Sequence, residues 1–388
     1  MIIGWIWVTG IAVAGYVLLM IIYSYCFRRL SPFLPSPAPA EPNIFFSVLI
    51  PARNEMESIA KSIDAVFGNT YPPDRFEVLV IDDFSEDDTP LQVIGLQKKY
   101  RNLRLIQLKD YPAGTTTTLY KKQAIETGIR ESRGTWIVTT DADAHVPSTW
   151  LSTLHAYIQQ HDPVFIASPV IFHAGKSILS VFQEIDFMTM QGITAASVSA
   201  GFHSMCNGAN LAYRKDCFYK VGGFSGNEHL ATGDDMLLMH KMKKTYPNKM
   251  GYIFSREAIV STDAQKSWRE FFQQRIRWAS KADSYGEPVI FGVLLWVWVM
   301  NTLLLAGLLL SLFEHNLLIP WLIIIAVKTM IELFFLLPVA TFFKRKSLLI
   351  YFPFLQPVHL LYIVLSGWLG KFGSYEWKNR VMNTSSRQ

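Results

Sequence analysis

The chain is poor in cysteine, and the few that it has form no recognisable pattern. Its 388 residues include only Cys26, Cys206 and Cys217, with no CxxC pair among them. Three is an odd number and the spacing is not that of metal ligands, which argues against a disulfide framework and against a cysteine zinc site. The cysteines therefore fit a protein whose globular part lies in a reducing cytoplasm.

Charge is also scarce. Charged residues make up 17% of the chain, and the net charge is +5. The basic residues are scattered or sit beside apolar runs, with no basic stripe interleaved with aromatics, so we expect no nucleic-acid partner. No glycine-rich phosphate loop and no internal repeat are present.

Apolar residues, in contrast, are abundant. Hydrophobic residues form 50% of the chain and aromatics 14%, a balance that indicates membrane segments. Residues 1–26 are almost wholly apolar and are followed by Arg28 and Arg29. Because the positive charge follows the run, we predict an uncleaved transmembrane anchor with its amino end outside, rather than a cleaved signal peptide.

The carboxyl third, residues 286–370, is predicted to be a membrane region with two to three apolar segments. Residues 288–313 and 317–343 are each long enough to span a bilayer. The third run, 347–370, contains Pro353 and Pro357, and we expect these prolines to interrupt it and make it re-entrant or interfacial. The side of the membrane on which the basic tail, 371–388, lies stays open.

Two charges, Lys328 and Glu332, fall inside the second carboxyl-terminal run, four residues apart. That spacing places them on one helix face. They form either a neutralised pair inside a helix bundle or a polar wall for a lipid head group.

A proline-rich linker, 27–44, separates the anchor from a globular domain that we place at 45–285. Short β-branched runs alternate there with stretches of helical spacing, such as 58–67 and 119–130. This alternation predicts an α/β fold, with a parallel-dominated sheet covered by helices on both faces and ligands at the carboxyl ends of the strands. The strand-like runs are 46–51, 77–81, 103–108, 135–140 and 164–169.

Polar clusters follow the first two predicted strands. The first contains Pro51, Arg53, Asn54 and Glu55, and the second begins with Asp82 and Asp83. Acidic side chains at adjacent strand ends can hydrogen-bond a base and ribose hydroxyls. The alternative is ordinary turn chemistry.

A third cluster, Asp141-Ala-Asp143, follows the strand-like residues 136–138. Two carboxylates one residue apart can bind Mg²⁺ or Mn²⁺ together with substrate phosphates. Such a cation would neutralise the charge on a departing diphosphate. The same short pattern also occurs by chance in loops.

Two further clusters lie closer to the carboxyl third. Asp234 and Asp235 precede a helix-like segment, where they could cap the helix or supply a general base. Gln274, Arg277 and Trp278 could grip a phosphate and offer a flat face to a sugar. Alone, this last cluster is better explained as a juxtamembrane amphipathic helix.

Taken together and in order, these clusters resemble the inverting family 2 glycosyltransferases of GT-A fold, in particular the membrane-bound members with a QxxRW signature. The resemblance covers about residues 45–278. It also draws in Lys121, which matches the family's lysine, and Gly208-Ala209-Asn210 with Arg214 and Gly222-Gly223-Phe224.

Two positions depart from the family pattern. The family has Glu-Asp where this chain has Asp234-Asp235, and the shorter side chain at Asp234 puts its acceptor contacts in doubt. The tail Glu376-Trp-Lys-Asn-Arg380 resembles a WKGR sequence with asparagine for glycine.

The resemblance implies a metal-dependent transfer from a nucleotide sugar, with a UDP-sugar favoured. Pro51, Arg53, Glu55, Asp82 and Asp83 would bind the nucleoside, and Asp141 and Asp143 would bind Mg²⁺ or Mn²⁺. Lys121, Gln274, Arg277 and Trp278 would contact the donor. Asp235 would be the base, and Asp234 would assist it.

The resemblance also suggests an integral protein of a bacterial inner membrane, with a cytoplasmic catalytic domain and a lipid or lipid-linked acceptor. A processive polysaccharide synthase is the alternative, although three or four spans make a self-sufficient export tunnel doubtful. A catalytically dead scaffold is a third possibility, against which the intact acidic residues argue. A partner subunit or oligomer is left open.

Overall fold

The computed structural model describes residues 2–35, 41–111, 120–173, 175–225, 234–281, 286–377 and 380–383. The chain forms two compact units. The globular unit comprises the described residues of Ser31–His173 and Ser204–Asp263. The membrane unit comprises those of Met1–Leu30, Ala174–His203 and Ala264–Gln388.

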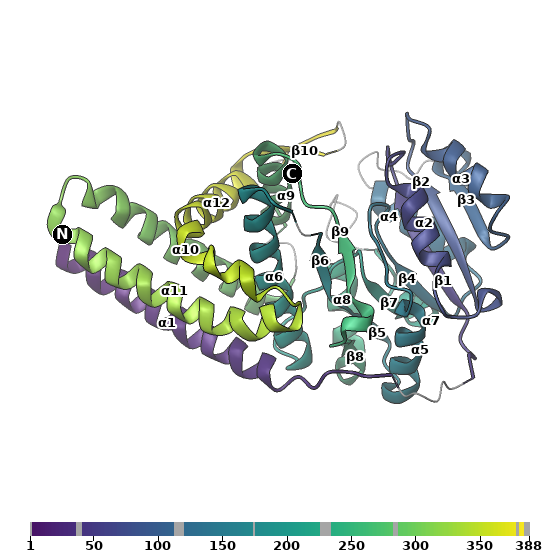
Figure 1. Ribbon diagram of the computed structural model, residues 1–388, viewed down its shortest axis with the longest axis horizontal. Helices are drawn as coiled ribbons and strands as arrows, with labels where there is room; N and C mark the ends of the chain where they lie inside the picture. The colour runs from purple at the N-terminus through teal and green to yellow at the C-terminus, as the bar shows by residue number, and fades with distance from the viewer. Residues whose placement is uncertain are drawn as a thin grey trace. The chain divides into compact units, whose positions relative to one another are not determined.

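The globular unit contains a seven-stranded sheet with the order β3-β2-β1-β4-β7-β5-β8 (Figure 1). Strands β1, β2, β3 and β4 are parallel to their neighbours within this group, and all five predicted strands are present. The sheet strands are β1 (Phe46–Ala52), β2 (Phe76–Asp82), β3 (Leu103–Gln107), β4 (Trp136–Thr139), β5 (Phe165–Ala167), β7 (Leu211–Arg214) and β8 (Met250–Tyr252).

Strand β7 is antiparallel to both β4 and β5. This arrangement brings the residues that precede β7 next to the end of β4, since Thr139 pairs with Leu211. A separate parallel pair joins β6 (Val170–Phe172) to β9 (Val260–Thr262). The sequence patterns did not predict β6, β7, β8 or β9, which have three or four residues each.

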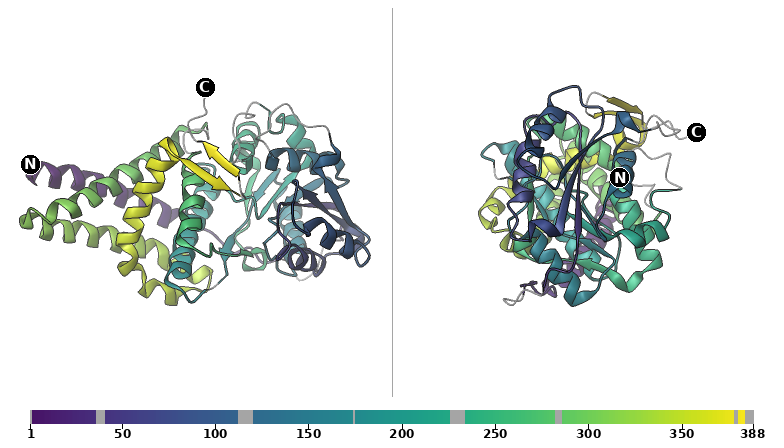
Figure 2. Two further views of the ribbon diagram at one scale, coloured as in Figure 1. Left: turned by 90° about the horizontal axis from the view of Figure 1, so that it is seen from above. Right: turned by 90° about the vertical axis from the view of Figure 1, so that its right-hand side faces the viewer.

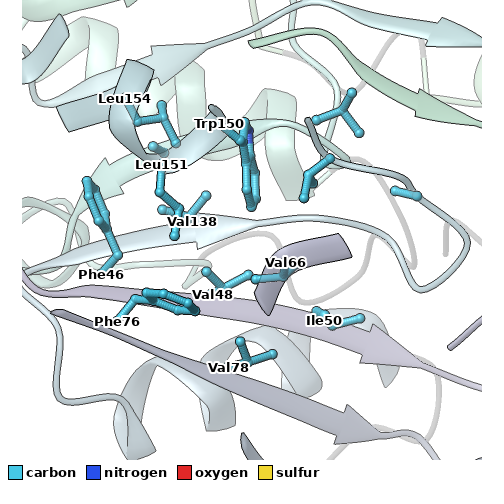
Figure 3. Close-up of a cluster of buried hydrophobic side chains, with 14 of the residues drawn as sticks. Phe46, Val48, Ile50, Val66, Phe76, Val78, Val138, Trp150, Leu151 and Leu154 are labelled. Carbon is cyan, nitrogen blue, oxygen red and sulfur yellow. The ribbon is translucent and has the colours of Figure 1, made fainter. Parts of the chain in front are cut away.

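Helices cover both faces of the sheet, as predicted. On one face, Phe46, Val48 and Ile50 of β1 share a core with Val66 and Trp150, and all five are fully or almost fully buried (Figure 3). The helices of this unit are α2 (Ile59–Phe67), α3 (Thr89–Gln97), α4 (Tyr120–Glu131), α5 (Trp150–His161), α7 (Lys215–Lys220) and α8 (Asp234–Thr245).

Helix α4 covers the opposite face of the sheet. A Cβ atom at Gly128 would lie 2.9 Å from Ile81 Cδ1 and 3.2 Å from Leu49 Cδ1, so the helix backbone touches the sheet here. Glycine is required for an approach this close. Helix α4 matters for function because Lys121 and Lys122 stand in its first turn.

The membrane unit is mainly helical. Helix α1 packs against α6, α10 and α11, and α12 packs against α9 and α10 (Figure 2). The helices are α1 (Ile2–Arg28), α6 (Ile178–Ser199), α9 (Trp268–Ala279), α10 (Pro288–Ser311), α11 (Leu318–Phe342) and α12 (Phe352–Phe372), followed by a hairpin of β10 (Ser374–Trp377) and β11 (Arg380–Asn383).

Among the described residues, four helices are long and apolar enough to cross a membrane, namely Ile3–Arg28, Pro288–Ser311, His315–Phe342 and Phe352–Phe372. The fourth corrects our expectation that prolines interrupt the last apolar run. Pro353 stands in the first turn of α12, where its missing N–H costs no helical hydrogen bond, and α12 continues through Pro357.

Lys328 and Glu332 form a closed polar cluster inside the membrane unit. The Lys328 ammonium lies 2.7 Å from Glu332 Oε1, and both residues are almost completely buried. Tyr16 of α1 donates a hydrogen bond to Glu332, and Gln356 of α12 bonds both charged groups. The first of our two interpretations, a neutralised pair inside the bundle, describes this cluster.

The boundary of the two units also differs from the single stretch 45–285 that we placed in the globular domain. Residues 174–203 and 264–281 group with the apolar helices. Helices α6 and α9 therefore belong to the membrane unit. The proline-rich linker falls partly outside the described residues.

Candidate active site

The polar clusters of the globular unit gather at the carboxyl ends of three neighbouring strands. Ala52 of β1 pairs with Asp82 of β2, and Leu49 of β1 pairs with Thr139 of β4. The segments that leave β1, β2 and β4 therefore start side by side. Ligands of open α/β sheets bind at this edge.

Arg53 organises the loop that follows β2. Its guanidinium donates to the carbonyl oxygens of Asp83 (2.8 Å) and Phe84 (2.9 Å) and forms an ion pair with Glu86 (3.1 Å). Phe84 has a positive φ of 53°, which is unusual for an aromatic residue. Arg53, which we predict to bind the nucleotide, thus holds a strained turn in place.

Asn54 and Glu55 complete the β1 side of this edge, after Pro51 near the end of the strand. Asn54 also has a positive φ, 52°, and its Oδ1 accepts the backbone N–H of Glu86 at 2.8 Å. The Glu55 carboxylate accepts the Ser58 hydroxyl at 2.8 Å, at the start of α2. These contacts tie the two loops together.

Asp82 and Asp83 are buried at the end of β2. Burial raises the pKa of Asp82 above its ordinary value, although hydrogen bonds from Ser85 partly offset this rise. Within the described residues, Asp82 Oδ1 is buried and has no hydrogen-bond partner. A buried acceptor of this kind is costly unless a ligand supplies a donor.

Asp141 and Asp143 lie in the segment that follows β4. Both are half-buried, whereas Ala142 and Ala144 between and after them are buried. The backbone turns here, since the N–H of Ala144 donates to the carbonyl oxygen of Asp141 at 3.1 Å, so both carboxylates belong to one tight turn after β4. The described residues contain no group of three or more His, Cys, Asp or Glu side chains arranged to hold a metal.

Lys121 of α4 lies against this acidic pair. Its ammonium is 3.1 Å from Asp141 Oδ1. Burial lowers the pKa of Lys121, but the carboxylates of Asp141 and Asp235 outweigh burial, so the net shift is upward from 10.5. Lys121 is therefore a fixed positive charge beside the predicted metal ligands.

Asp235, in the first turn of α8, is oriented by two backbone groups. Its Oδ2 accepts the N–H of Gly208 at 3.0 Å, and its Oδ1 accepts the N–H of Met236 at 2.9 Å. Gly208 in turn accepts the Thr139 hydroxyl at 2.8 Å, at the end of β4. The half-buried Asp235 carboxylate is thereby linked to the edge that carries Asp141.

Gly208 marks the point where these groups converge. A Cβ atom at Gly208 would lie 3.6 Å from Asp235 Oδ2 and 3.7 Å from Lys121 Nζ. One small space is thus bordered by the Asp235 carboxylate and by the Lys121 ammonium that contacts Asp141. The Asp235 carboxylate, the Lys121 ammonium and the nearby pair of Asp141 and Asp143 together suit chemistry on a phosphorylated substrate.

Asp234 has different surroundings from Asp235. It is buried, and its Oδ1 lies 3.6 Å from the ammonium of Lys122, which is buried too. This position connects the start of α8 to α4. The catalytic role and acceptor contacts of Asp234 stay predictions, and its side chain also pairs with Lys122, a residue that no motif singled out.

Asn210 is a second residue whose role the sequence patterns did not reveal. Its amide donates to the carbonyl oxygens of Pro169 (2.9 Å) and Ala258 (2.8 Å), and its Oδ1 accepts the Trp150 indole N–H (2.9 Å). These bonds fix the segment that carries Gly208. Only the resemblance to Gly-Ala-Asn had drawn attention to it.

Gln274, Arg277 and Trp278 lie on α9 of the membrane unit and are half-buried. Helix α9 starts with a capping box between Ser267 and Glu270, an arrangement that fixes a helix start. The donor contacts assigned to these three residues stay predictions.

Models of two known families match the sequence of this chain. A family model described as glycosyl transferase family group 2 matches residues 136–365, and one described as glycosyl transferase family 2 matches residues 47–222. The chain belongs to glycosyl transferase family group 2. It is therefore a glycosyltransferase.

Individual relatives are more distant. This glycosyltransferase is 28% identical over 239 residues to the Probable glycosyltransferase YdaM of Bacillus subtilis, which is 60% of this chain and 54% of YdaM. This chain thus spans about half the length of YdaM. It is also 21% identical over 324 residues, 77% of this chain and 92% of the relative, to a Methanococcus voltae protein named dolichyl N-acetyl-alpha-D-glucosaminyl phosphate 3-beta-D-2,3-diacetamido-2,3-dideoxy-beta-D-glucuronosyltransferase.

The fold of the glycosyltransferase is similar to that of a solved structure, the mannosyltransferase PcManGT from Pyrobaculum calidifontis in complex with GDP-Man and Mn²⁺. The TM-score is 0.61 at 18% sequence identity, with 95% of this chain and 99% of that chain covered. The predicted fold class, GT-A with an amino-terminal and several carboxyl-terminal apolar helices, is confirmed.

Proposed function

We propose that this glycosyltransferase moves one sugar from a nucleotide-sugar donor to a lipid or lipid-linked acceptor, with inversion at the anomeric carbon. The observation that carries the proposal is the position of Asp235. Its carboxylate is held by Gly208, next to the Lys121–Asp141 ion pair. A base and a diphosphate-binding edge are thus neighbours.

Asp235 is suited to act as the general base. Backbone N–H groups occupy one position on each of its oxygens, and an ionised carboxylate can accept further hydrogen bonds. In the proposed step the acceptor hydroxyl gives its proton to Asp235 while its oxygen bonds to the anomeric carbon. The bond from that carbon to the diphosphate breaks on the opposite side, and the nucleoside diphosphate leaves.

Asp141 and Asp143 fit a divalent cation, Mg²⁺ or Mn²⁺. They present hard oxygen ligands from one tight turn of the chain, and magnesium sites often use one or two carboxylates completed by phosphates and water. When bound, the cation would neutralise charge on the diphosphate. The Mn²⁺ in the PcManGT complex supports this proposal, and Lys121 supplies a positive charge of the protein's own.

The nucleoside would bind where β1 and β2 end. The buried Asp82 Oδ1 needs a donor, and a base N–H or a ribose hydroxyl provides one. We propose a UDP-sugar as donor. A GDP-sugar is the alternative to be tested, because PcManGT was solved with GDP-Man.

The membrane unit supports a lipid acceptor. The described part of the chain carries four helices long and apolar enough to span a bilayer, and the name of the relative from Methanococcus voltae includes a dolichyl N-acetyl-alpha-D-glucosaminyl phosphate. Arg28 is the last residue of α1 and Arg29 follows it, and residues 344–346 follow α11 as Lys-Arg-Lys. By the positive-inside rule, we propose that these ends face the cytoplasm of a bacterial inner membrane, together with the catalytic unit.

The test is donor turnover by the purified protein in lipid nanodiscs. A panel of UDP- and GDP-sugars is supplied with Mg²⁺ or Mn²⁺, and label is followed into the lipid extract with and without chelator. Chelator-sensitive label in a lipid that carries one sugar supports the proposal. Label in a long polymer instead would favour the processive synthase, and no turnover of any donor by the protein in its own membranes would favour a scaffold.

A further inference from the structure

Helix α9 carries an arginine that the proposed donor contacts do not use. Arg275 lies between Gln274 and Arg277, but it is only 4% exposed, whereas Gln274, Arg277 and Trp278 are half-buried. Arg275 therefore points into the membrane unit. A charged group can stay there only if its surroundings compensate it.

Asp186 of α6 compensates the Arg275 charge. The Arg275 Nε and Nη2 atoms lie 3.1 Å and 2.7 Å from Asp186 Oδ2. The other carboxylate oxygen, Oδ1, accepts the hydroxyl of Tyr362 in α12. Asp186 thus joins α6, α9 and α12 through one buried carboxylate.

The same guanidinium reaches two of the residues that we propose for donor binding. Its Nη1 donates to Gln274 Oε1 at 2.8 Å. Its central carbon lies 4.2 Å from the centre of the Trp278 ring and 4.7 Å from that of Phe271. The N–H groups at the edge of the Arg275 guanidinium therefore bond Gln274 and Asp186, while its flat face packs on the Trp278 ring.

We propose that Arg275 is a positioning residue: anchored by Asp186 and Tyr362, it sets the side chains of Gln274 and Trp278 for the donor and couples them to membrane helix α12. The inference rests on the proposed function for the donor role of Gln274 and Trp278. Only arginine combines a planar fork of donors with a stacking face, so lysine cannot replace it.

The experiment compares Arg275→Lys and Tyr362→Phe with a matched control, Arg345→Lys. Arg345 also pairs with a buried carboxylate of α6, Glu184, so this control reports what weakening such a pair does to the unit. In nanodiscs we expect Arg275→Lys to raise the donor KM about tenfold, because charge-assisted hydrogen bonds are lost. Tyr362→Phe loses a single hydrogen bond, so we expect it to raise the donor KM about threefold. The control should stay within about twofold of wild type on the same scale.

Gln274→Ala and Trp278→Ala are measured in the same series. If they raise the donor KM while Arg275→Lys and Tyr362→Phe behave like the control, the positioning role is wrong although the donor role stands. If Gln274→Ala and Trp278→Ala leave the KM unchanged, the donor role itself fails.

A second readout does not depend on activity. Hydrogen exchange of the backbone amides in Trp268–Ala279 should be faster in Tyr362→Phe than in wild type, and unchanged in Arg345→Lys. Tyr362→Phe removes one hydroxyl and no charge, so the unit should still fold. Equal exchange in the two variants would contradict the coupling of α9 to α12.

Discussion

Asp235 Oδ2 and the backbone nitrogen of Gly208 are 3.0 Å apart and share a hydrogen bond. This contact joins the first turn of α8 to the segment before β7, and the Thr139 hydroxyl extends it to β4. The proposed base is thus positioned by the backbone rather than by another side chain. Its orientation should therefore survive changes to neighbouring side chains.

Asp235→Asn removes the proton acceptor and keeps the shape of the side chain. We expect kcat to fall about 10²- to 10⁴-fold, the usual contribution of general base catalysis, while the donor KM changes little. The exposed Asp263 of the same unit provides the control, and Asp263→Asn should leave both constants unchanged. Full activity in Asp235→Asn would refute the assignment of the base.

Gly208→Ala tests the small space beside the base. The new methyl group would stand at ordinary contact distance from Asp235 Oδ2 and Lys121 Nζ, so the fold should tolerate it. It would occupy room that the reacting groups need, and we expect kcat/KM to fall about tenfold or more with an unchanged melting temperature.

Gly95 of α3 provides the control for that substitution, since a Cβ atom there meets nothing within 4 Å. Gly95→Ala should keep full activity and slightly stabilise the protein. Wild-type kinetics in Gly208→Ala would show that no substrate group approaches this point.

Lys122→Met tests the buried pair with Asp234. The substitution leaves the Asp234 carboxylate buried without its cation, which should cost about 3–5 kcal/mol of stability. The double variant Lys122→Met/Asp234→Asn carries neither charge and should recover most of the loss. Thermal unfolding of the purified variants measures both.

The exposed pair of Lys99 and Asp64 is the control for the Lys122 experiment. Lys99→Met should leave the melting temperature nearly unchanged, because exposed ion pairs stabilise little. If Lys122→Met were equally harmless, Asp234 would be free to contact the acceptor, as the motif first suggested.

Asp82→Asn should separate stability from function. Burial raises the pKa of Asp82, so its ionised form destabilises the folded state above that pKa. The variant should melt at a higher temperature than wild type at pH 7, and its advantage should shrink toward pH 4 as Asp82 of the wild type takes up its proton. The donor KM should rise, because a buried acceptor for the nucleoside is lost.

Local sequence patterns predicted the half of the sheet that carries the site. Strands β1, β2 and β4 are apolar runs that end in polar clusters, so both their existence and the position of the site followed from order along the chain. Strand β7 lies antiparallel between β4 and β5, and its position depends on this pairing rather than on a local pattern. The same holds for the turn from which Gly208 reaches Asp235.

Roles that depend on a distant partner could not be predicted. The buried ion pair of Asp234 with Lys122, more than a hundred positions earlier in the chain, is one example. Helix α12 was expected to break at its prolines, whereas Gln356 ties it into the Lys328–Glu332 cluster. In both cases tertiary contacts decided what a local pattern left open.

A single displacement at the anomeric carbon with Asp235 as base inverts that carbon, so the configuration of the product distinguishes this mechanism from a double displacement. The product formed from a donor of known configuration is analysed by proton NMR through its anomeric coupling constant. We expect a configuration opposite to that of the donor, and strongly reduced product formation in Asp235→Asn. A product that retains the donor's configuration would contradict it.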